Sequence, residues 1–305
     1  MKLATTTGDF ARYTHSQEER IRYIAEAGFR YADYNFCTDY DRKEGVFASD
    51  EDGFVASYAA KIKQAADECG VKLIQAHAPM GRPLLEGDNH AEFVNANIRC
   101  IECCSLLGID RIVVHSGYLP DIPKNECFKR NAAFFRELLP AAEKYGVYIL
   151  VENFNKMSKA NVYWIDNAPD LKRLIKLVDH PLFQAVWDTG HANMQEMPQD
   201  VSLRLLGKHV MALHVQDNMG DKDSHVAPFF GTLNLDSLMA GLLDIGYDGY
   251  FTFEATNIFL PGKKRRQSDK EKKLLNAPLE LRKKAESLLY EIGKTVLEAY
   301  GVFEE

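Results

Sequence analysis

Short apolar segments alternate with longer amphipathic segments along almost the whole chain. Apolar runs such as Arg111-Ile112-Val113-Val114-His115 are typical of strands covered on both faces, as in an all-parallel sheet. The amphipathic segments, for example 89–107, 125–145 and 235–245, have the apolar spacing of helices. The pattern predicts strands at 2–6, 29–36, 72–79, 111–117, 147–154, 183–189, 210–217 and 249–255.

Glycines mark the joints between these helices and strands. They recur at intervals of about 40 residues, with one interval of about 60, and glycine just past a helix end is a common left-handed cap. The longer interval contains one more joint, at which Pro181 is expected to stop the helix. Seven joints imply eight strands. The six joint glycines are Gly28, Gly70, Gly108, Gly146, Gly207 and Gly246.

Eight alternating units of this size predict a single (β/α)8 TIM barrel that spans residues 1–305. The alternative is an open doubly wound sheet, although no glycine-rich turn follows the first strand to support a dinucleotide site. Two further elements are expected after the last strand. They are a basic loop at 261–273 and a C-terminal helix at 279–300.

The composition and charge of the chain indicate which kinds of partner and which compartment to expect. The chain has 305 residues, 46% of them hydrophobic, and a formal net charge of −7, so its surface repels nucleic acid and anionic membranes. The sequence has no charged and apolar leader and no membrane-length apolar run. Cys100 and Cys103 lie on an apolar helical stripe, where buried reduced thiols are expected. We therefore expect a cytoplasmic protein.

Polar residues occupy the carboxyl ends of the predicted strands, six to eight residues after each joint. In a barrel these ends converge on one mouth, where the sites of such barrels are built. A charged residue at the end of an apolar strand is costly unless it is paired or coordinated. The residues concerned are Asn35, His77, His115, Glu152, Asp188, His214 and Glu254.

Three of these residues are carboxylates, which would repel one another and raise each other's pKa values in one mouth. A divalent cation would remove the conflict. Two glutamates, one aspartate and one histidine form a mixed oxygen and nitrogen set that suits Mn, Co, Mg, Fe or Zn. The pattern therefore predicts one divalent metal ion at the strand ends.

Five motifs in this order resemble the xylose-isomerase-like barrel superfamily, which includes ketose 3-epimerases, inosose dehydratases and endonuclease IV. The motifs are Val151-Glu152-Asn153, Trp187-Asp188-Thr189-Gly190-His191, His214-Val215-Gln216-Asp217-Asn218, Asp223-Ser224-His225 and Phe253-Glu254-Ala255. The resemblance extends from the first predicted strand to about Ala255. It implies that Glu152, Asp188, His214 and Glu254 are the metal ligands, and that His191 and the region of His225 contact the substrate.

The predicted activity is isomerisation or epimerisation of a small sugar or polyol. The metal ion would polarise a carbonyl and stabilise the enediolate that forms when the neighbouring proton leaves. Glu152 and Glu254 are the predicted catalytic residues, one removing the proton and the other returning it. The predicted substrate-binding residues are His77, His115, His191 and His225. A dehydratase or lyase, which begins with the same proton removal, is the alternative, including as a subunit of a two-protein enzyme.

Phosphodiester cleavage is a further alternative, because the chain resembles endonuclease IV at nine residues that hold three zinc ions in that family. Charge opposes this interpretation, since a DNA enzyme needs a basic face. The 261–273 loop has seven basic and two acidic residues, so the remainder of the chain carries −12. We therefore expect no nucleic-acid or membrane partner and leave open a homo-oligomer or a partner subunit. The nine residues are His77, His115, Glu152, Asp188, His191, His214, Asp223, His225 and Glu254.

Overall fold

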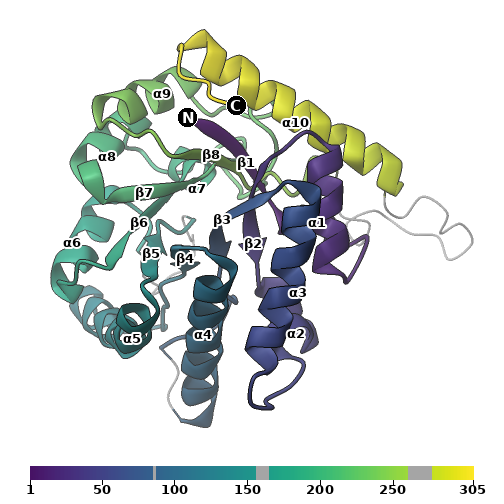
Figure 1. The fold of residues 1–305 in the computed structure, drawn as a ribbon. Coiled ribbons are helices and arrows are strands. Elements are labelled where there is room, and N and C mark those ends of the chain that lie inside the picture. The colour runs from purple at the N-terminus through teal and green to yellow at the C-terminus, as the bar shows by residue number, and fades with distance from the viewer. Residues whose placement is uncertain (85–86, 156–164, 260–276) are drawn as a thin grey trace, which may run out of the picture.

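The computed structural model describes residues 1–84, 87–155, 165–259 and 277–305, which form a parallel barrel of eight strands with helices outside it (Figure 1). Hydrogen-bonded neighbours follow the order β7-β6-β5-β4-β3-β2-β1-β8. The predicted (β/α)8 barrel is confirmed, and the open doubly wound alternative is wrong. The strands are β1 (Lys2–Thr6), β2 (Tyr31–Asn35), β3 (Lys72–His77), β4 (Arg111–Val114), β5 (Tyr148–Glu152), β6 (Phe183–Asp188), β7 (Val210–His214) and β8 (Tyr250–Phe253).

The barrel closes between β7 and β8, just beyond the last residue of β7 and at the end of β8. The amide of Val215 donates to the carbonyl of Thr252 at 2.7 Å, and the amide of Glu254 donates to the carbonyl of Val215 at 3.0 Å. Val215 and Phe253 also form a parallel bridge. This closure brings Glu254 into the same mouth as the strand ends of β5, β6 and β7.

Helices surround the strands, and those predicted from apolar spacing agree with the structure to within one residue at each end. The longer helices are α1 (Gln17–Glu26), α3 (Phe54–Cys69), α4 (Asp88–Leu107), α5 (Lys124–Tyr145), α6 (Ala168–Val178), α8 (Gln199–Leu206), α9 (Leu235–Asp244) and α10 (Leu279–Ala299). Shorter elements are η1 (Thr7–Phe10), α2 (Cys37–Arg42), η2 (Gly45–Phe47), α7 (Thr189–Asn193) and η3 (Gly207–His209).

The helix-to-strand joints depend on left-handed backbone conformations. Gly108 and Gly146, with φ of +77° and +68°, end α4 and α5 as predicted. The joint after α6 differs from the prediction, because Asp179 itself adopts the left-handed conformation, with φ of +52°. Aspartate tolerates this conformation better than most residues. The helix therefore ends at Val178, before Pro181 can stop it.

The observed strands end earlier than most of the predicted ones. β4 ends at Val114 and β7 at His214, whereas the apolar pattern extends them to 117 and 217. Val215 still bonds to β8, but farther along both segments the backbone bonds to side chains and loops instead of a neighbouring strand. The amide of Gly117 donates to Asn131 Oδ1 at 2.7 Å, and the amide of Asp217 donates to the carbonyl of Val226 at 2.8 Å.

Two separate apolar clusters stabilise the barrel. The larger one fills the space between the outer face of the strands and the helices, and includes Phe251, Phe253 and Leu289. The smaller one lies inside the barrel and consists of Val113, Leu150, Val186 and Ala212. These inward-facing residues come from β4 to β7, so the interior is a packed core rather than a channel.

Other predictions concern the cysteines, the membrane and the basic loop. All six cysteines are free thiols, and Cys100 and Cys103 are buried as predicted. None of the described helices is long and apolar enough to cross a bilayer. The predicted basic loop at 261–273 lies outside the described residues, whereas the predicted C-terminal helix corresponds to α10.

Candidate active site

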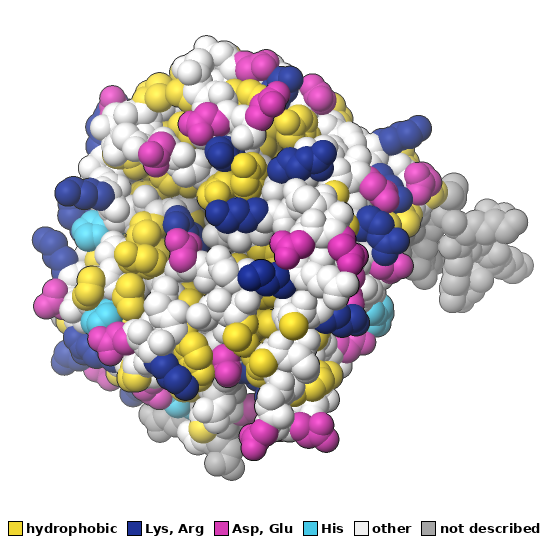
Figure 2. Space-filling model, viewed as in Figure 1, with side chains coloured by type: hydrophobic (Ala, Val, Ile, Leu, Met, Phe, Trp, Pro, Cys, Tyr) yellow, Lys and Arg dark blue, Asp and Glu magenta, His cyan; other side chains and the backbone are white. Residues whose placement is uncertain are grey.

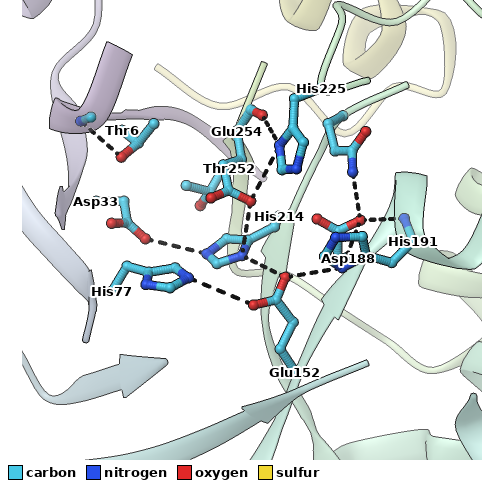
Figure 3. Close-up of polar contacts among 12 residues, drawn as sticks. Thr6, Asp33, His77, Glu152, Asp188, His191, His214, His225, Thr252 and Glu254 are labelled. Atoms are coloured by element: carbon cyan, nitrogen blue, oxygen red, sulfur yellow. Dashed lines mark hydrogen bonds and ion pairs between the residues drawn. The ribbon is translucent and has the colours of Figure 1, made fainter. Parts of the chain in front are cut away.

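Six of the seven polar residues predicted at the strand ends, all except Asn35, meet at the carboxyl-terminal mouth of the barrel, and Figure 3 labels each of the six but His115. Glu152, Asp188 and His214 are the last residues of β5, β6 and β7, and His77 is the last residue of β3. His115 and Glu254 lie one residue beyond β4 and β8. Because successive strand residues face opposite sides, each of these side chains is directed by its strand toward the mouth.

Four of these residues bring one ligand atom each within 4.8 Å of one another: Glu152, Asp188, His214 and Glu254. His214 Nδ1 lies 3.2 Å from Glu152 Oε1 and 3.5 Å from Glu254 Oε2. A single ion with ligands at about 2.0–2.2 Å can span such a set. The four predicted ligands therefore lie together in the structure as a compact set of oxygen and nitrogen donors.

Asp188 supplies a direct test of whether this cage fits a metal ion. Its Oδ1 accepts hydrogen bonds from the amide of His191 at 2.6 Å and from Gln216 Nε2 at 3.2 Å. Its Oδ2 is buried and has no hydrogen-bond partner among the described residues. An orphaned buried carboxylate oxygen is costly. Coordination to a cation would satisfy this atom, so the donor set fits a divalent ion.

Neighbouring side chains hold the backbone of Asp188 and link its carboxylate to Asp223. Asn153 forms a reciprocal pair with the Asp188 backbone: its Nδ2 donates to the carbonyl at 2.9 Å, and its Oδ1 accepts from the amide at 2.8 Å. Gln216 Nε2 also donates to Asp223 Oδ1 at 2.9 Å. These contacts tie together the ends of β5, β6 and β7, so Asp188 is held in place before any ligand binds.

The carboxylates do not all titrate as their crowding predicts. Burial raises the pKa of Asp188 to about 7, and the charges of Glu152 and Glu254 add to this rise. Burial also opposes ionisation of Glu152, but His214 and His115 hold its pKa well below its ordinary range. The prediction that crowding raises every carboxylate pKa is therefore wrong for Glu152, because histidines surround it.

His77, His115 and Glu152 form one histidine-rich side of the mouth. His115 Nε2 lies 2.7 Å from Glu152 Oε2 and 3.1 Å from His77 Nε2. His77 Nδ1 is directed at the carbonyl of Ala78 at 2.8 Å, with Cys37 Sγ at 3.3 Å. A hydrogen bond to that carbonyl leaves His77 Nε2 facing the mouth. One atom each from His77, Glu152 and His214 also forms a group that fits a metal ion.

His191, Asp223 and His225 form the opposite side. Asp223 lies between the two rings, 3.2 Å from His191 Nε2 and 3.1 Å from His225 Nε2. The Nδ1 atoms are directed at the carbonyls of Asn153 and Glu254, at 2.9 Å and 3.0 Å. Burial lowers the pKa of His225, but Asp223 and Glu254 outweigh it and raise this pKa to about 9. These three residues are a third group that fits a metal ion.

Several residues of the site have no strong signal in the sequence. Asp33, Gln75 and Thr252 lie inside strands rather than at strand ends, and Cys37 begins a short helix. The one available signal is Asp33, a charged residue inside a strand that is otherwise buried. Such a residue requires a partner across the barrel, which the pattern along the chain cannot identify.

Together these features define a parallel (β/α)8 barrel with a candidate metal centre at its carboxyl-terminal mouth. The chain belongs to the xylose isomerase-like TIM barrel family, which matches residues 21–277. This family assignment confirms the resemblance that the sequence motifs indicated.

Curated relatives include several sugar enzymes. Fructoselysine 3-epimerase of Escherichia coli O157:H7 is 31% identical over 48% of this chain and 51% of that protein. An uncharacterized protein of Methanocaldococcus jannaschii is 29% identical over 59% of this chain and 60% of its own length. The chain thus spans less than two thirds of these two relatives. 2-Oxo-tetronate isomerase of Haemophilus influenzae is 24% identical over 76% of this chain and 84% of that protein.

Solved structures show the same fold. D-psicose 3-epimerase from Clostridium cellulolyticum H10 superposes with a TM-score of 0.74 and 18% identity, covering 97% of this chain and 99% of that one. A D-tagatose 3-epimerase-like protein gives a TM-score of 0.70 and 21% identity, covering 99% and 100%. At these identities the likeness establishes the architecture alone.

Proposed function

We propose that this protein is a divalent-metal-dependent isomerase or epimerase of a sugar or polyol. The observation that carries the proposal is the pair of carboxylates from different sides of the barrel, Glu152 and Glu254, that meet at one nitrogen of His214. The side chain of Glu152 is 1% exposed, whereas that of Glu254 is 16% exposed and reaches the open mouth. Two acids in such different surroundings suit two different roles in proton transfer.

A divalent ion held by Glu152, Asp188, His214 and Glu254 would polarise a substrate carbonyl and make the neighbouring proton more acidic. The chain's own residues then supply the proton transfer. One glutamate removes the proton from the carbon beside the carbonyl, and the other returns a proton to the same carbon or its neighbour. His214 and His115 keep the pKa of Glu152 low, so this residue is present as the carboxylate, the form that a general base must have.

Four histidines are proposed to bind the substrate hydroxyls: His77, His115, His191 and His225. Each lies at the mouth with ring nitrogens able to donate or accept hydrogen bonds, which suits a polyol. The names of the relatives support a sugar-like substrate, because they include a fructoselysine 3-epimerase and a 2-oxo-tetronate isomerase.

Proton exchange with solvent tests the proposal. The metal-loaded protein is incubated in deuterated water with a panel of ketoses and keto-polyols, and the substrates are examined by NMR and mass spectrometry. A true substrate should gain deuterium at the carbon beside its carbonyl. Turnover without label at that carbon would overturn the roles given to Glu152 and Glu254. A product that lacks one water molecule relative to its substrate would instead identify the lyase alternative, which shares the proton-removal step.

Single variants sharpen this experiment. With metal content checked in each, Glu152→Gln and Glu254→Gln should lower turnover by about 10²–10⁴-fold. Each single variant should still exchange the proton beside the carbonyl in one of the two epimers, because one carboxylate remains on one face of that carbon. Asp39→Asn is the matched control, since Asp39 is buried outside the mouth with Gln17 Nε2 at 2.9 Å and Arg20 Nη1 at 3.4 Å. Its exchange should equal that of the unchanged protein.

A second candidate is a phosphodiesterase with three metal ions, favoured by the three groups of ligand atoms that the mouth contains. Charge weighs against it. The chain carries a net −7, and on the face shown in Figure 2 basic and acidic side chains are interspersed. Mixed charge on an acidic protein provides little attraction for a polyanion. Cleavage of a DNA substrate with an abasic site by the zinc-loaded protein would support this candidate.

A further inference from the structure

Asp33 is a buried carboxylate in the middle of β2, below the strand ends that form the mouth. It is 1% exposed, in a barrel interior whose β4 to β7 side is the apolar cluster of Val113, Leu150, Val186 and Ala212. A carboxylate in such surroundings is costly unless it is hydrogen-bonded or paired. Its Oδ2 contacts two side chains, Gln75 and the proposed metal ligand His214, and Figure 3 shows the contact with His214.

A chain of hydrogen bonds orients Asp33 across three strands. Thr252 Oγ1, from β8, donates to Gln75 Oε1 at 3.3 Å. This contact fixes the Gln75 amide so that its Nε2, from β3, donates to Asp33 Oδ2 at 2.7 Å. The same Asp33 oxygen lies 3.4 Å from His214 Nε2. The nitrogen of His214 that faces the barrel interior, Nε2, therefore lies beside a carboxylate oxygen that Gln75 holds in place.

The other nitrogen of His214 faces the carboxylate cage. Its Nδ1 lies 3.2 Å from Glu152 Oε1 and 3.5 Å from Glu254 Oε2. An ionised carboxylate can only accept hydrogen bonds, so Asp33 favours the tautomer in which Nε2 carries the proton. The Nδ1 lone pair is then directed at the cage. A carboxylate behind a histidine ligand also raises the basicity of that ligand and fixes its ring plane.

We propose that Asp33 is a positioning residue of the metal centre, and that Gln75 and Thr252 hold the Asp33 carboxylate in its orientation. It sets the tautomer and orientation of His214 without touching the ion or the substrate. This inference rests on the proposed metal cage and extends the site by one strand, β2, which contributes no ligand to the four-residue cage. Its expected effect falls on metal affinity first.

Cobalt titration tests the proposal without an activity assay. Apoprotein is titrated with Co²⁺ and followed by the visible absorption of the bound ion, with thermal unfolding measured in parallel. Asp33→Asn keeps the shape of the side chain and removes its charge, and should weaken Co²⁺ affinity by about 10–100-fold. The Co²⁺ spectrum should also change, because the ring plane of His214 is no longer fixed. Asp39→Asn, the control for loss of a buried acid elsewhere, should bind Co²⁺ as the unchanged protein does.

Gln75→Leu provides a second variant, which leaves Asp33 in place and removes the amide that orients it. The Co²⁺ affinity of Gln75→Leu should also fall, by a smaller factor than that of Asp33→Asn. If Asp33→Asn does not fold, the result for Gln75→Leu alone tests the role of Asp33. Unchanged Co²⁺ affinity in the folded variants, or an equal loss in Asp39→Asn, would overturn the role of Asp33. Failure of the unchanged protein to bind Co²⁺ would instead overturn the metal cage itself, so the two failures are distinguishable.

Discussion

Gly190 lies directly against the side-chain amide of Gln216: a β-carbon built on Gly190 would be 2.1 Å from both the carbon and the oxygen of that amide. Gln216 can donate to Asp188 and Asp223 because this glycine leaves room for it. The Gly190 of the Asp188-Thr189-Gly190-His191 motif is thus required by packing beside the site, not by a left-handed backbone.

Substitution of Gly190 tests this close approach. Gly190→Ala should lower the free energy of unfolding by about 1–3 kcal/mol, the usual cost of forcing an extra methyl group into a packed site. In a Gln216→Ala background the same change should cost much less, because the clashing amide is absent. Urea unfolding of the single and double variants measures the effect. An equal cost of Gly190→Ala in both backgrounds would show that the Gln216 contact is not its cause.

Metal content tests the cage directly. The purified protein should contain close to one tightly held divalent ion per chain, because Asp188 Oδ2 is otherwise an orphaned buried acceptor. The double change Glu152→Gln with Asp188→Asn removes two of the anionic ligands and should abolish binding, whereas Asp39→Asn should not. Elemental analysis provides the measurement. A metal-free protein that manganese and cobalt also fail to stabilise against heat would refute the cage.

The number of ions decides between the two candidate functions. We expect one ion among Glu152, Asp188, His214 and Glu254, with His77 and His225 unbound. Three divalent ions would leave the mouth with excess positive charge, which suits a phosphate ligand but not a neutral sugar. Anomalous scattering at the zinc edge, from crystals grown with excess zinc, locates the ions. Three peaks within about 5 Å of one another, with His77 and His225 as ligands, would favour the phosphodiesterase.

The contact between His225 and Asp223 makes the stability of the metal-free protein depend on pH. The pKa of His225 is raised to about 9, so its contribution is complete below the unfolded pKa of about 6.5 and is lost as pH rises through about 9. Asp223 behaves in the opposite sense. Hydrogen bonds from His191 and His225 hold the pKa of Asp223 below its ordinary value despite burial, so the contribution of Asp223 to stability is present above about pH 4 and is lost as pH falls.

The variant Asp223→Asn removes the carboxylate that both His191 and His225 contact. The difference in urea midpoint between the unchanged and variant metal-free proteins should be large at pH 6 and smaller at pH 9. Unfolding at both pH values, with metal removed by a chelator, gives the four midpoints. A difference that stays constant over this range would contradict the proposed pairing of Asp223 with protonated histidine.

The sequence by itself determined the architecture and which side chains stand at the ends of the strands. Eight apolar strands separated by helices of similar length pack most readily as a parallel barrel. In such a barrel the carboxyl ends of all strands converge on one mouth, so the last residues of the strands lie there. For this reason Glu152, Asp188 and His214 could be placed together from spacing alone. The strand ends and the joint at Asp179 were less well determined, because loop hydrogen bonds and one left-handed residue decide them.

Only the tertiary structure decided the contacts across the barrel. Asp33 and His214 are 181 residues apart in the chain, and only barrel closure brings them within 3.4 Å. The low pKa of Glu152 likewise depends on His214 and His115, which come from other strands. Periodicity along a chain specifies which way a side chain faces, whereas the charges around it depend on which strands the closed barrel makes neighbours.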